Sequence, residues 1–541
     1  MTIPSKHILL LIIFLVACSP RSESQTESAE SSGVLSFIHL NDTYRLDAVE
    51  EGKAGGFGRV VTIIRQLQSQ GNDVRILHAG DFLFPSLESQ IWSGEQMVEA
   101  LNFMDDLAPM YVVTGNHELD RRTPSALANA IRQSRFDWLG DNMRLNTGDQ
   151  NVDQRLETGF IFESQGKKVG VLSLALHARD GGNSRDYAPI DGDYIAVARQ
   201  ALENLDAQEV DLIVGVTHLH LRTDKEVARL KAGHPRFLFI VGGHDHEPEH
   251  ELATEESAEI MKGASNARTI WQIDLRFPED GGIPEIASKP IRIDETIASD
   301  PEYDAISSRW RNKLLDTIPF LSARVGTAAL PMDAREETIR NEESSWANFI
   351  VDQMRTAFGE PAADFAFVNS GTFRIDDYVA EDVTFEDIGR TFGFSSFLRH
   401  LVLSGSEFKM LLEAGYRGTS TSQGYFPQIS GFRVCVDRSR PEGDRIVQLQ
   451  KPAEDTWTDV EPDEDYLLVA PDFLYRGGDG YDFSKAREVS RPGSELKYLV
   501  LDAIIQAQAA GETIGEPIST SEPRIAMLAG GVDSCFGTNV N

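Results

Sequence analysis

Five short apolar runs in the first half of the chain each end in residues that could bind a metal ion. The residues that follow these runs are Asn41-Asp42, Gly80-Asp81, Gly115-Asn116-His117-Glu118, His218, and Gly243-His244-Asp245-His246. Carboxylates, an amide and imidazoles form a mixed oxygen and nitrogen set, which suits borderline or hard divalent ions such as Zn, Mn or Fe. Two such ions that share an activated water would support hydrolysis, and Asp81 is the candidate for the carboxylate that bridges them.

The elements that must position these residues follow an alternating pattern. From about residue 34 to residue 277, short apolar runs alternate with amphipathic stretches such as 59–70 and 95–104, which is typical of an α/β layer fold. In open α/β sheets, sites form at the carboxyl ends of the strands, because the loops there converge in one crevice. We therefore expect the five polar clusters to meet in space.

The pattern changes after the Gly- and Pro-containing segment 277–290. Residues 34–299 are expected to form the first domain, 300–322 a helical connector, 323–528 a second, mixed domain and 529–541 a tail. Because 541 residues are too many for one hydrophobic core, the length also favours at least two domains.

The charge balance excludes some classes of partner. The chain has 51 Lys and Arg against 85 Asp and Glu, a formal net charge of −34. Such a surface repels nucleic acid and anionic lipid, so neither is expected as a non-specific partner. An anionic substrate would therefore need cations concentrated at its site, either metal ions or a few placed arginines.

The first residues have the pattern of an export signal. Lys6 and His7 precede ten apolar residues, 8–17, a run that is too short to span a bilayer. The sequence Leu-Val-Ala-Cys at 15–18 resembles the lipobox of bacterial lipoproteins, which implies cleavage after residue 17 and lipidation of Cys18. Residues 18–33 are then expected to form a flexible tether, and the protein is expected to be exported and lipid-anchored on the periplasmic or cell-surface side. The alternative is an ordinary secretory signal with an incidental cysteine.

The motifs ND, GD, GNHE, TH and GHDH, taken together and in this order, resemble those of the calcineurin-like metallophosphoesterases. GNHELD followed by a second domain resembles the 5'-nucleotidase family within them. The resemblance implies an N-terminal four-layer β-sandwich flanked by helices, a C-terminal mixed α/β substrate-binding domain, and two divalent ions (Mn, Zn, Fe or Co).

The same resemblance assigns roles to single residues of the first domain. It implies that Asp42 and His246 hold the first ion, that Asn116, His218 and His244 hold the second, and that Asp81 bridges both. His117 and Asp120 match the family's catalytic pair, an imidazole that is oriented by a carboxylate. Glu118, His220 and Asp245 are expected to support these residues and not to bind the ions themselves.

Tyr44 departs from the family pattern, because most members have Asp-x-His where this chain has Asp42-Thr43-Tyr44. A phenol ionises near pH 10, so it would ligate well only to a strongly polarising ion such as ferric iron. Alternatively, the phenol lies beside the ligands, a water takes the position, and the first ion binds more weakly. We interpret the change as tuning of the site and not as loss of activity.

The second domain contains stretches that resemble the family's substrate-binding elements. FVNSGTFR implies that Asn369 and Arg374 contact the substrate, and DFLYRGGDGYDF implies that Phe473 stacks on a base while Asp479 accepts ribose hydroxyls. Phe473 could instead be a core residue. In GFSSFLRHLVLSG, the position of the second clamp aromatic is assigned to Leu398, with aromatic residues at 394 and 397 nearby.

These observations predict an exported, metal-dependent phosphoester hydrolase that acts on small nucleotides or related phosphoesters and contacts the membrane only through its lipid. The first expectation is a 5'-nucleotidase. The alternatives are a UDP-sugar hydrolase, a 2',3'-cyclic nucleotide phosphodiesterase, a sulfur-ester hydrolase, or a surface protein that binds nucleotides without turnover. The pairing of Cys435 with Cys535 and the oligomeric state stay open.

Overall fold

The computed structural model describes residues 33–183, 185–278, 282–418, 423–454, 456–519, 521–528 and 535–536. The predicted signal peptide, Cys18 and all of the predicted tether except Gly33 lie outside these residues. Within the described part of the chain, no helix is both long enough and apolar enough to cross a membrane.

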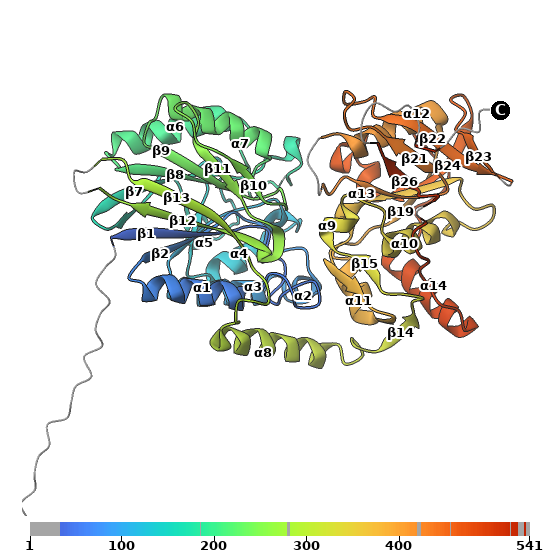
Figure 1. The fold of residues 1–541 in the computed structure, drawn as a ribbon, viewed down its shortest axis with the longest axis horizontal. Helices are drawn as coiled ribbons and strands as arrows, with labels where there is room; N and C mark the ends of the chain where they lie inside the picture. Colours follow the sequence, from blue (N-terminus) through green and yellow to red (C-terminus); the bar gives the residue numbers. More distant parts are fainter. Residues whose placement is uncertain are drawn as a thin grey trace, which may run out of the picture.

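The N-terminal domain is a sandwich of two sheets (Figure 1). The first sheet has the order β13 (Glu285–Arg292), β12 (Thr269–Arg276), β1 (Val34–Leu40), β2 (Asp73–His78), β3 (Met110–Val113), β4 (Asp137–Leu139) and β5 (Leu156–Glu157). The second has the order β10 (Glu249–Glu251), β11 (Glu259–Lys262), β9 (Phe237–Gly242), β8 (Leu212–Thr217), β7 (Lys167–Leu174) and β6 (Phe160–Ser164).

Helices cover the outer face of each sheet and complete the four layers (Figure 1). The first sheet packs on α1 (Phe57–Ser69), α3 (Glu95–Leu107) and α4 (Ser125–Gln133), and the second on α6 (Tyr194–Ala207) and α7 (Leu221–Ala228). Successive side chains of a strand point to opposite faces. In β1, Phe37 therefore packs between the sheets, whereas Ile38 packs toward the helices. The shorter helices α2 (Leu87–Trp92) and α5 (Gln150–Asp153) lie in connecting segments.

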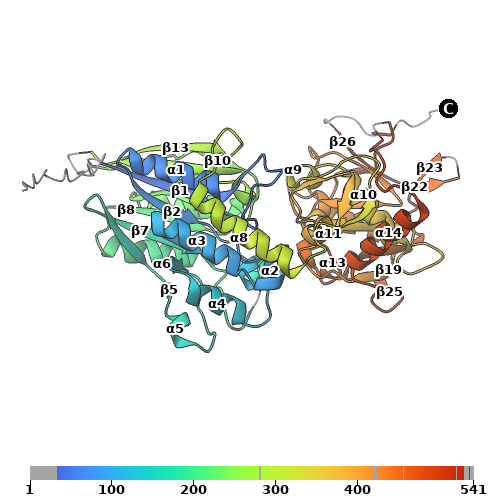
Figure 2. The ribbon, with the colours of Figure 1, turned by 90° about the horizontal axis from the view of Figure 1, so that it is seen from below.

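A long helix, α8 (Pro301–Thr317), leads from the first domain to the second (Figure 2). Asp300 caps its first turn by accepting from the backbone N–H groups of Glu302 and Tyr303, and Pro301 occupies a first-turn position that needs no N–H donor. Figure 2 shows α8 lying along α1 and α3. The helix is therefore packed as part of the N-terminal domain.

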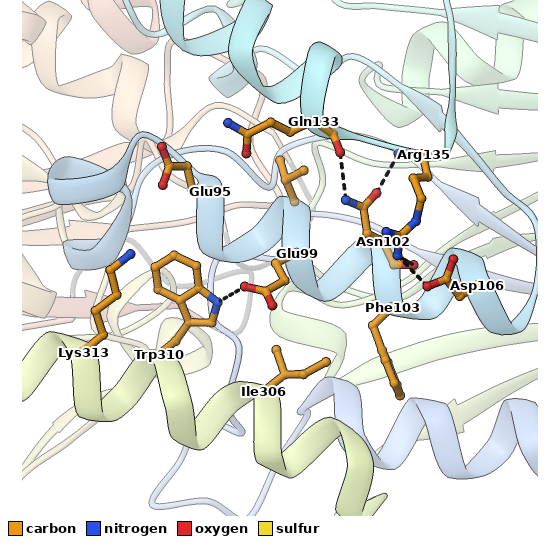
Figure 3. Close-up of a pocket in the computed structure, with 11 residues that line it drawn as sticks. Glu95, Glu99, Asn102, Phe103, Asp106, Gln133, Arg135, Ile306, Trp310 and Lys313 are labelled. Atoms are coloured by element: carbon orange, nitrogen blue, oxygen red, sulfur yellow. Dashed lines mark hydrogen bonds and ion pairs between the residues drawn. The ribbon is translucent and has the colours of Figure 1, made fainter.

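Polar and aromatic contacts fasten α8 to α3 around a cavity of about 550 Å³ (Figure 3). Trp310 donates its indole N–H to Glu99 Oε2 at 2.8 Å. The ammonium of Lys313 lies 3.9 Å from the ring centroid of Trp310 and 4.8 Å from that of Trp92 in α2. These contacts hold the helix to the first domain, and Arg311 of the same helix pairs with Glu386 of the C-terminal domain.

The C-terminal domain is built on a five-stranded sheet. Its order is β20 (Pro427–Ser430), β16 (Phe365–Asn369), β24 (Asp465–Pro471), β19 (Leu398–Ser404) and β25 (Arg487–Glu488). One face packs on α10 (Ser345–Thr356) and α14 (Leu496–Ala510). The other packs on α12 (Gly405–Glu413) and on a four-stranded sheet, β23 (Thr456–Asp459), β22 (Ile446–Ala453), β21 (Arg433–Val436) and β26 (Ile525–Met527).

Smaller elements complete this domain. They are β14 (Arg324–Thr327) paired with β18 (Asp382–Thr384), β15 (Met332–Ala334) paired with β17 (Asp377–Val379), and the helices α9 (Glu336–Ile339), α11 (Phe385–Thr391) and α13 (Asp472–Tyr475). A disulfide joins Cys435 of β21 to Cys535, which answers the question that the sequence left open.

Candidate active site

The five polar clusters meet at one end of the sandwich. Strands β1, β2 and β3 are parallel neighbours in the first sheet, and β8 and β9 are parallel neighbours in the second. Their carboxyl ends bring together Asp42, Asp81, Asn116, His218, His244 and His246, the six predicted metal ligands. The prediction that the five polar clusters lie close together in space is therefore confirmed.

The donor atoms form two groups that share Asp81. In the first, Asp42 Oδ1 lies 3.2 Å from His246 Nε2. In the second, Asn116 Oδ1 lies 3.1 Å from both His218 Nε2 and His244 Nδ1, and His218 Nε2 lies 3.2 Å from Asp81 Oδ2. Ligand atoms about 2.0–2.2 Å from one ion are roughly 3.0–3.5 Å from each other by simple geometry, so the donor set fits bound divalent ions.

The charge of the site supports the same fit. Asp42 and Asp81 are both buried, at 0% and 1% exposure, and two buried carboxylates require a compensating positive charge. Burial opposes a charge on His218, but the Asp81 carboxylate outweighs this and raises the pKa of His218 to about 10. The carboxylates thus draw positive charge into the cluster, and divalent ions would supply it.

The backbone around the ligands is tightly constrained. Asp42, Asp81 and His244 have φ angles of 51°, 60° and 75°, a region that side chains other than glycine rarely adopt. Gly115 explains part of the GNHE motif, because a Cβ atom there would lie only 2.2 Å from Asp81 Oδ1. The loops are held in uncommon conformations that aim their side chains at one point.

Glu118 holds two of these loops together. Its carboxylate accepts from the backbone N–H groups of Asp81, Phe82, Leu83 and Gly115 at 2.7–3.0 Å. Through these hydrogen bonds, Glu118 holds the backbone of the two loops that carry Asp81 and Asn116.

A buried lysine that the sequence analysis did not identify supports the other loops. Lys262 is fully buried, and its ammonium donates to the carbonyls of Leu219 and Gly243 at 2.6 and 3.0 Å. It also pairs with Asp224 and Asp245 at 2.8 and 2.9 Å. Lys262 thereby fixes the segments that carry His218 and His244. A single lysine in an apolar strand was the only available signal.

His117 and Asp120 are in contact, as the resemblance implies for a catalytic pair. His117 Nδ1 lies 3.0 Å from Asp120 Oδ2, and Asp120 also accepts from Asn183 at 2.9 Å. His117 Nε2 faces the metal cluster, 3.9 Å from Asp81 Oδ2. With Nδ1–H donating to the carboxylate, Nε2 is the ring nitrogen that is directed toward the reaction.

Tyr44 lies within the first donor group. Its hydroxyl is 3.2 Å from Asp42 Oδ1, 3.3 Å from His246 Nε2 and 3.5 Å from Asp81 Oδ2. Burial and then the carboxylates of Asp42 and Asp81 raise the pKa of Tyr44 well above its usual value, which favours the neutral phenol in this chain. Tyr44 therefore lies where it can alter the affinity for the first ion.

The predicted substrate residues come from two adjacent loops of the C-terminal domain. Asn369 donates to Asp479 Oδ2 at 2.8 Å, which joins the loops. Arg374 Nη2 lies 3.3 Å from His117 Nε2, so this arginine reaches the N-terminal domain. Phe473 is 44% exposed and is therefore not a core residue.

The assignment of Leu398 was wrong. Leu398 begins β19, pairs with Pro471 and is fully buried, so it cannot face a ligand. Phe397, the residue before it, is 43% exposed, and its backbone is hydrogen-bonded to Asp472, the neighbour of Phe473. Phe394 lies beside the catalytic pair, with its ring 5.6 Å from that of His117 and 5.1 Å from the guanidinium of Arg374.

Comparisons with known proteins agree with this arrangement. Residues 35–248 match the family model for calcineurin-like phosphoesterases, and residues 324–486 match the model for the 5'-nucleotidase C-terminal domain. The trifunctional nucleotide phosphoesterase protein YfkN of Bacillus subtilis is 24% identical over 86% of this chain, and the chain spans 33% of that relative's length. Human 5'-nucleotidase is 22% identical over 83% of this chain and 84% of its own length.

Two solved structures share the fold. The 5'-nucleotidase precursor from Thermus thermophilus has a TM-score of 0.76 with 21% identity, covering 92% of this chain and 100% of the other. The sulfate thiohydrolase SoxB of Thermus thermophilus has a TM-score of 0.69 with 14% identity, covering 92% and 97%.

The sandwich and its donor set define a calcineurin-like metallophosphoesterase, a metal-dependent phosphoester hydrolase. Because its second domain matches the 5'-nucleotidase C-terminal domain, the chain belongs to the 5'-nucleotidase family of these enzymes.

Proposed function

We propose that this enzyme is a 5'-nucleotidase that uses two divalent ions to release phosphate from nucleoside monophosphates. The observation that carries the proposal is the meeting of the domains at His117. Arg374 of the C-terminal domain reaches His117 Nε2, which faces the shared ligand Asp81. Arg374 Nη1 is buried and, among the described residues, has no hydrogen-bond partner, so it can donate to a phosphoryl oxygen.

The residues of the chain divide the reaction between them. Asp42 and His246 would hold one ion, and Asn116, His218 and His244 the other, with Asp81 between them. When bound, such ions supply stabilisation of phosphoryl oxygens and a water nucleophile of lowered pKa. When the His117 ring carries both protons, Nε2–H is placed to donate a hydrogen bond to a phosphoryl oxygen or its proton to the leaving oxygen. Asp120 holds the imidazole in the orientation that this requires.

The C-terminal loops supply the nucleoside end of the site. The half-exposed ring of Phe473 lies over Gly478, because a Cβ at that glycine would be 2.6 Å from it, and the ring offers a face for a base. Asp479 is held by Asn369 and can accept ribose hydroxyls. The names of the relatives from Bacillus subtilis and human both refer to nucleotide substrates, which supports this choice.

The proposal includes export and lipid anchoring through Cys18, supported by the residues at 6–18 alone. Expression in a bacterial host with a radiolabelled fatty acid tests it. Label should enter the unmodified chain and be absent from Cys18→Ser, and equal label in both would contradict the anchor.

The activity test measures the product that each substrate releases with the chain from Ser19 onward: phosphate from AMP, UMP and glucose 1-phosphate from UDP-glucose, and p-nitrophenol from bis(p-nitrophenyl) phosphate. Each substrate is assayed with Mn, Zn or Co and with no added metal, and His117→Ala serves as the control for contaminating phosphatases. Metal-dependent release from AMP that is lost in His117→Ala supports a 5'-nucleotidase. If AMP binds but is not hydrolysed with any of the metals, the proposal of an enzyme fails and a nucleotide-binding protein takes its place.

A further inference from the structure

One half of the candidate metal site is completed by a residue from the other domain. His246 Nε2 faces Asp42 and Tyr44, and its second ring nitrogen, Nδ1, lies 2.6 Å from Glu336 Oε1. Glu336 is the first residue of α9 in the C-terminal domain, 90 positions further along the chain. Both side chains are buried, at 6% and 9% exposure, so the contact is sealed between the domains.

Both domains hold the Glu336 carboxylate in place. From the N-terminal domain, the Ser265 hydroxyl donates to Oε2, and Arg268 Nη2 lies 3.4 Å from the same oxygen. From its own domain, Arg340 pairs with Oε1, and the Glu336 backbone N–H donates to Asp376 Oδ1 at 2.9 Å. Two arginines balance this carboxylate in a buried position, so it is a built contact and not a chance approach.

No such dependence applies to His218 in the other half of the site. His218 Nδ1 lies 2.6 Å from the Ala79 carbonyl, which belongs to the same domain as the ring. His218 is therefore oriented before the domains meet, whereas His246 is oriented by Glu336 only when they meet.

We propose that Glu336 is a positioning residue that the C-terminal domain contributes to the first-ion group, and that this group binds its ion at full affinity only when the domains are docked. A carboxylate that accepts the free N–H of a ligating imidazole fixes its tautomer and orientation and makes the other nitrogen a better ligand. His246 is the only imidazole assigned to this group, because position 44, where most family members have a histidine, carries a tyrosine whose phenol lies beside His246. The inference rests on the proposed two-ion site and adds a coupling between metal binding and domain docking.

Calorimetric titration of the metal-free chain from Ser19 with Mn²⁺ tests this directly, without any substrate. The unmodified chain should bind two ions. In Glu336→Ala, one of the two affinities should fall by about 10- to 100-fold while the other stays unchanged. Glu336→Gln keeps the shape and an acceptor oxygen but removes the charge, so we expect a smaller loss at the same ion.

Two matched variants separate positioning from general damage. Glu337→Ala removes the exposed neighbouring carboxylate and should leave both affinities unchanged. Glu88→Gln weakens a distant contact between the domains, the ion pair with Arg390 at 3.0 Å, and should weaken the same single ion as Glu336→Ala, by less. Thermal unfolding of each metal-free variant verifies that it is folded.

The outcomes distinguish this inference from the proposed function. Two unchanged affinities in a folded Glu336→Ala would overturn the inference, and equal weakening of both ions would do the same. If the unmodified chain releases no phosphate from AMP but one ion still depends on Glu336, the nucleotidase proposal fails and the inference stands.

Discussion

The two halves of the metal site differ in what supports them. The second-ion donors Asn116, His218 and His244 all come from the N-terminal domain, and His218 is oriented by a carbonyl of that domain. The first-ion group contains Tyr44, and its imidazole is oriented by Glu336 of the other domain. One half is therefore fixed by a single rigid sandwich, and the other can respond to the arrangement of the domains.

The largest expected effect removes the residue that the two halves share. In Asp81→Asn, the loss of a bridging negative charge should weaken both ions and cost several kcal/mol of stabilisation, about 10⁴-fold in kcat. Steady-state kinetics with AMP and Mn²⁺ titration measure the two effects. Loss of one ion alone would show that Asp81 belongs to one half only.

Removing the catalytic imidazole should slow the reaction and leave both halves of the metal site intact. For His117→Ala we expect about a 10³-fold loss in kcat, because Nε2 no longer assists the leaving oxygen. The two Mn²⁺ affinities should match those of the unmodified chain, since His117 lies 3.9 Å from Asp81 and is not assigned to an ion. A large change in metal affinity would instead make His117 a ligand.

A smaller effect is expected at the nucleoside end, where Phe473 is not among the predicted metal ligands. Phe473→Ala should raise KM for AMP by about 10- to 100-fold, the loss of one stacking contact, with kcat changed little. Ribose 5-phosphate has no aromatic ring to stack, so its KM provides the control and should not move. A similar rise for both substrates would mean that Phe473 shapes the site without stacking on a base.

Features that are local in the chain were predictable from the sequence to a large extent. Apolar runs that end in polar residues indicated both the strands and the polar clusters that meet at the site, because a buried strand and its first loop residue are adjacent in the chain, and the family resemblance then selected six of these residues as predicted ligands. Leu398 was assigned wrongly because the sequence does not show that β19 begins there, and a shift of one residue exchanges a buried leucine for the exposed Phe397.

Contacts between residues that are far apart in the chain could not be predicted in the same way. Glu336 and His246 are 90 residues apart, and neither local pattern refers to the other. Lys262 looked like one charge in an apolar strand, and its four partners come from segments that only the folded sandwich brings near it. The disulfide between Cys435 and Cys535 likewise depends on how β21 and the chain end pack.

The last prediction concerns Tyr44, whose replacement should change the affinity of only one half of the metal site and by the smallest amount. In Tyr44→His, an imidazole replaces a phenol that lies 3.2 to 3.5 Å from Asp42, His246 and Asp81, and a neutral imidazole is a far better ligand at neutral pH. We expect the Mn²⁺ concentration for half activity to fall by about tenfold, and the affinity for the second ion to stay unchanged. Tyr44→Phe keeps the ring and removes the oxygen. If the hydroxyl helps to bind the ion, the Mn²⁺ concentration for half activity should rise in this variant. If the hydroxyl does not help, that concentration should stay unchanged. If neither variant changed the metal requirement, the first-ion group would not include position 44, and the dependence of that group on Glu336 would then have to be explained through Asp42 and His246 alone.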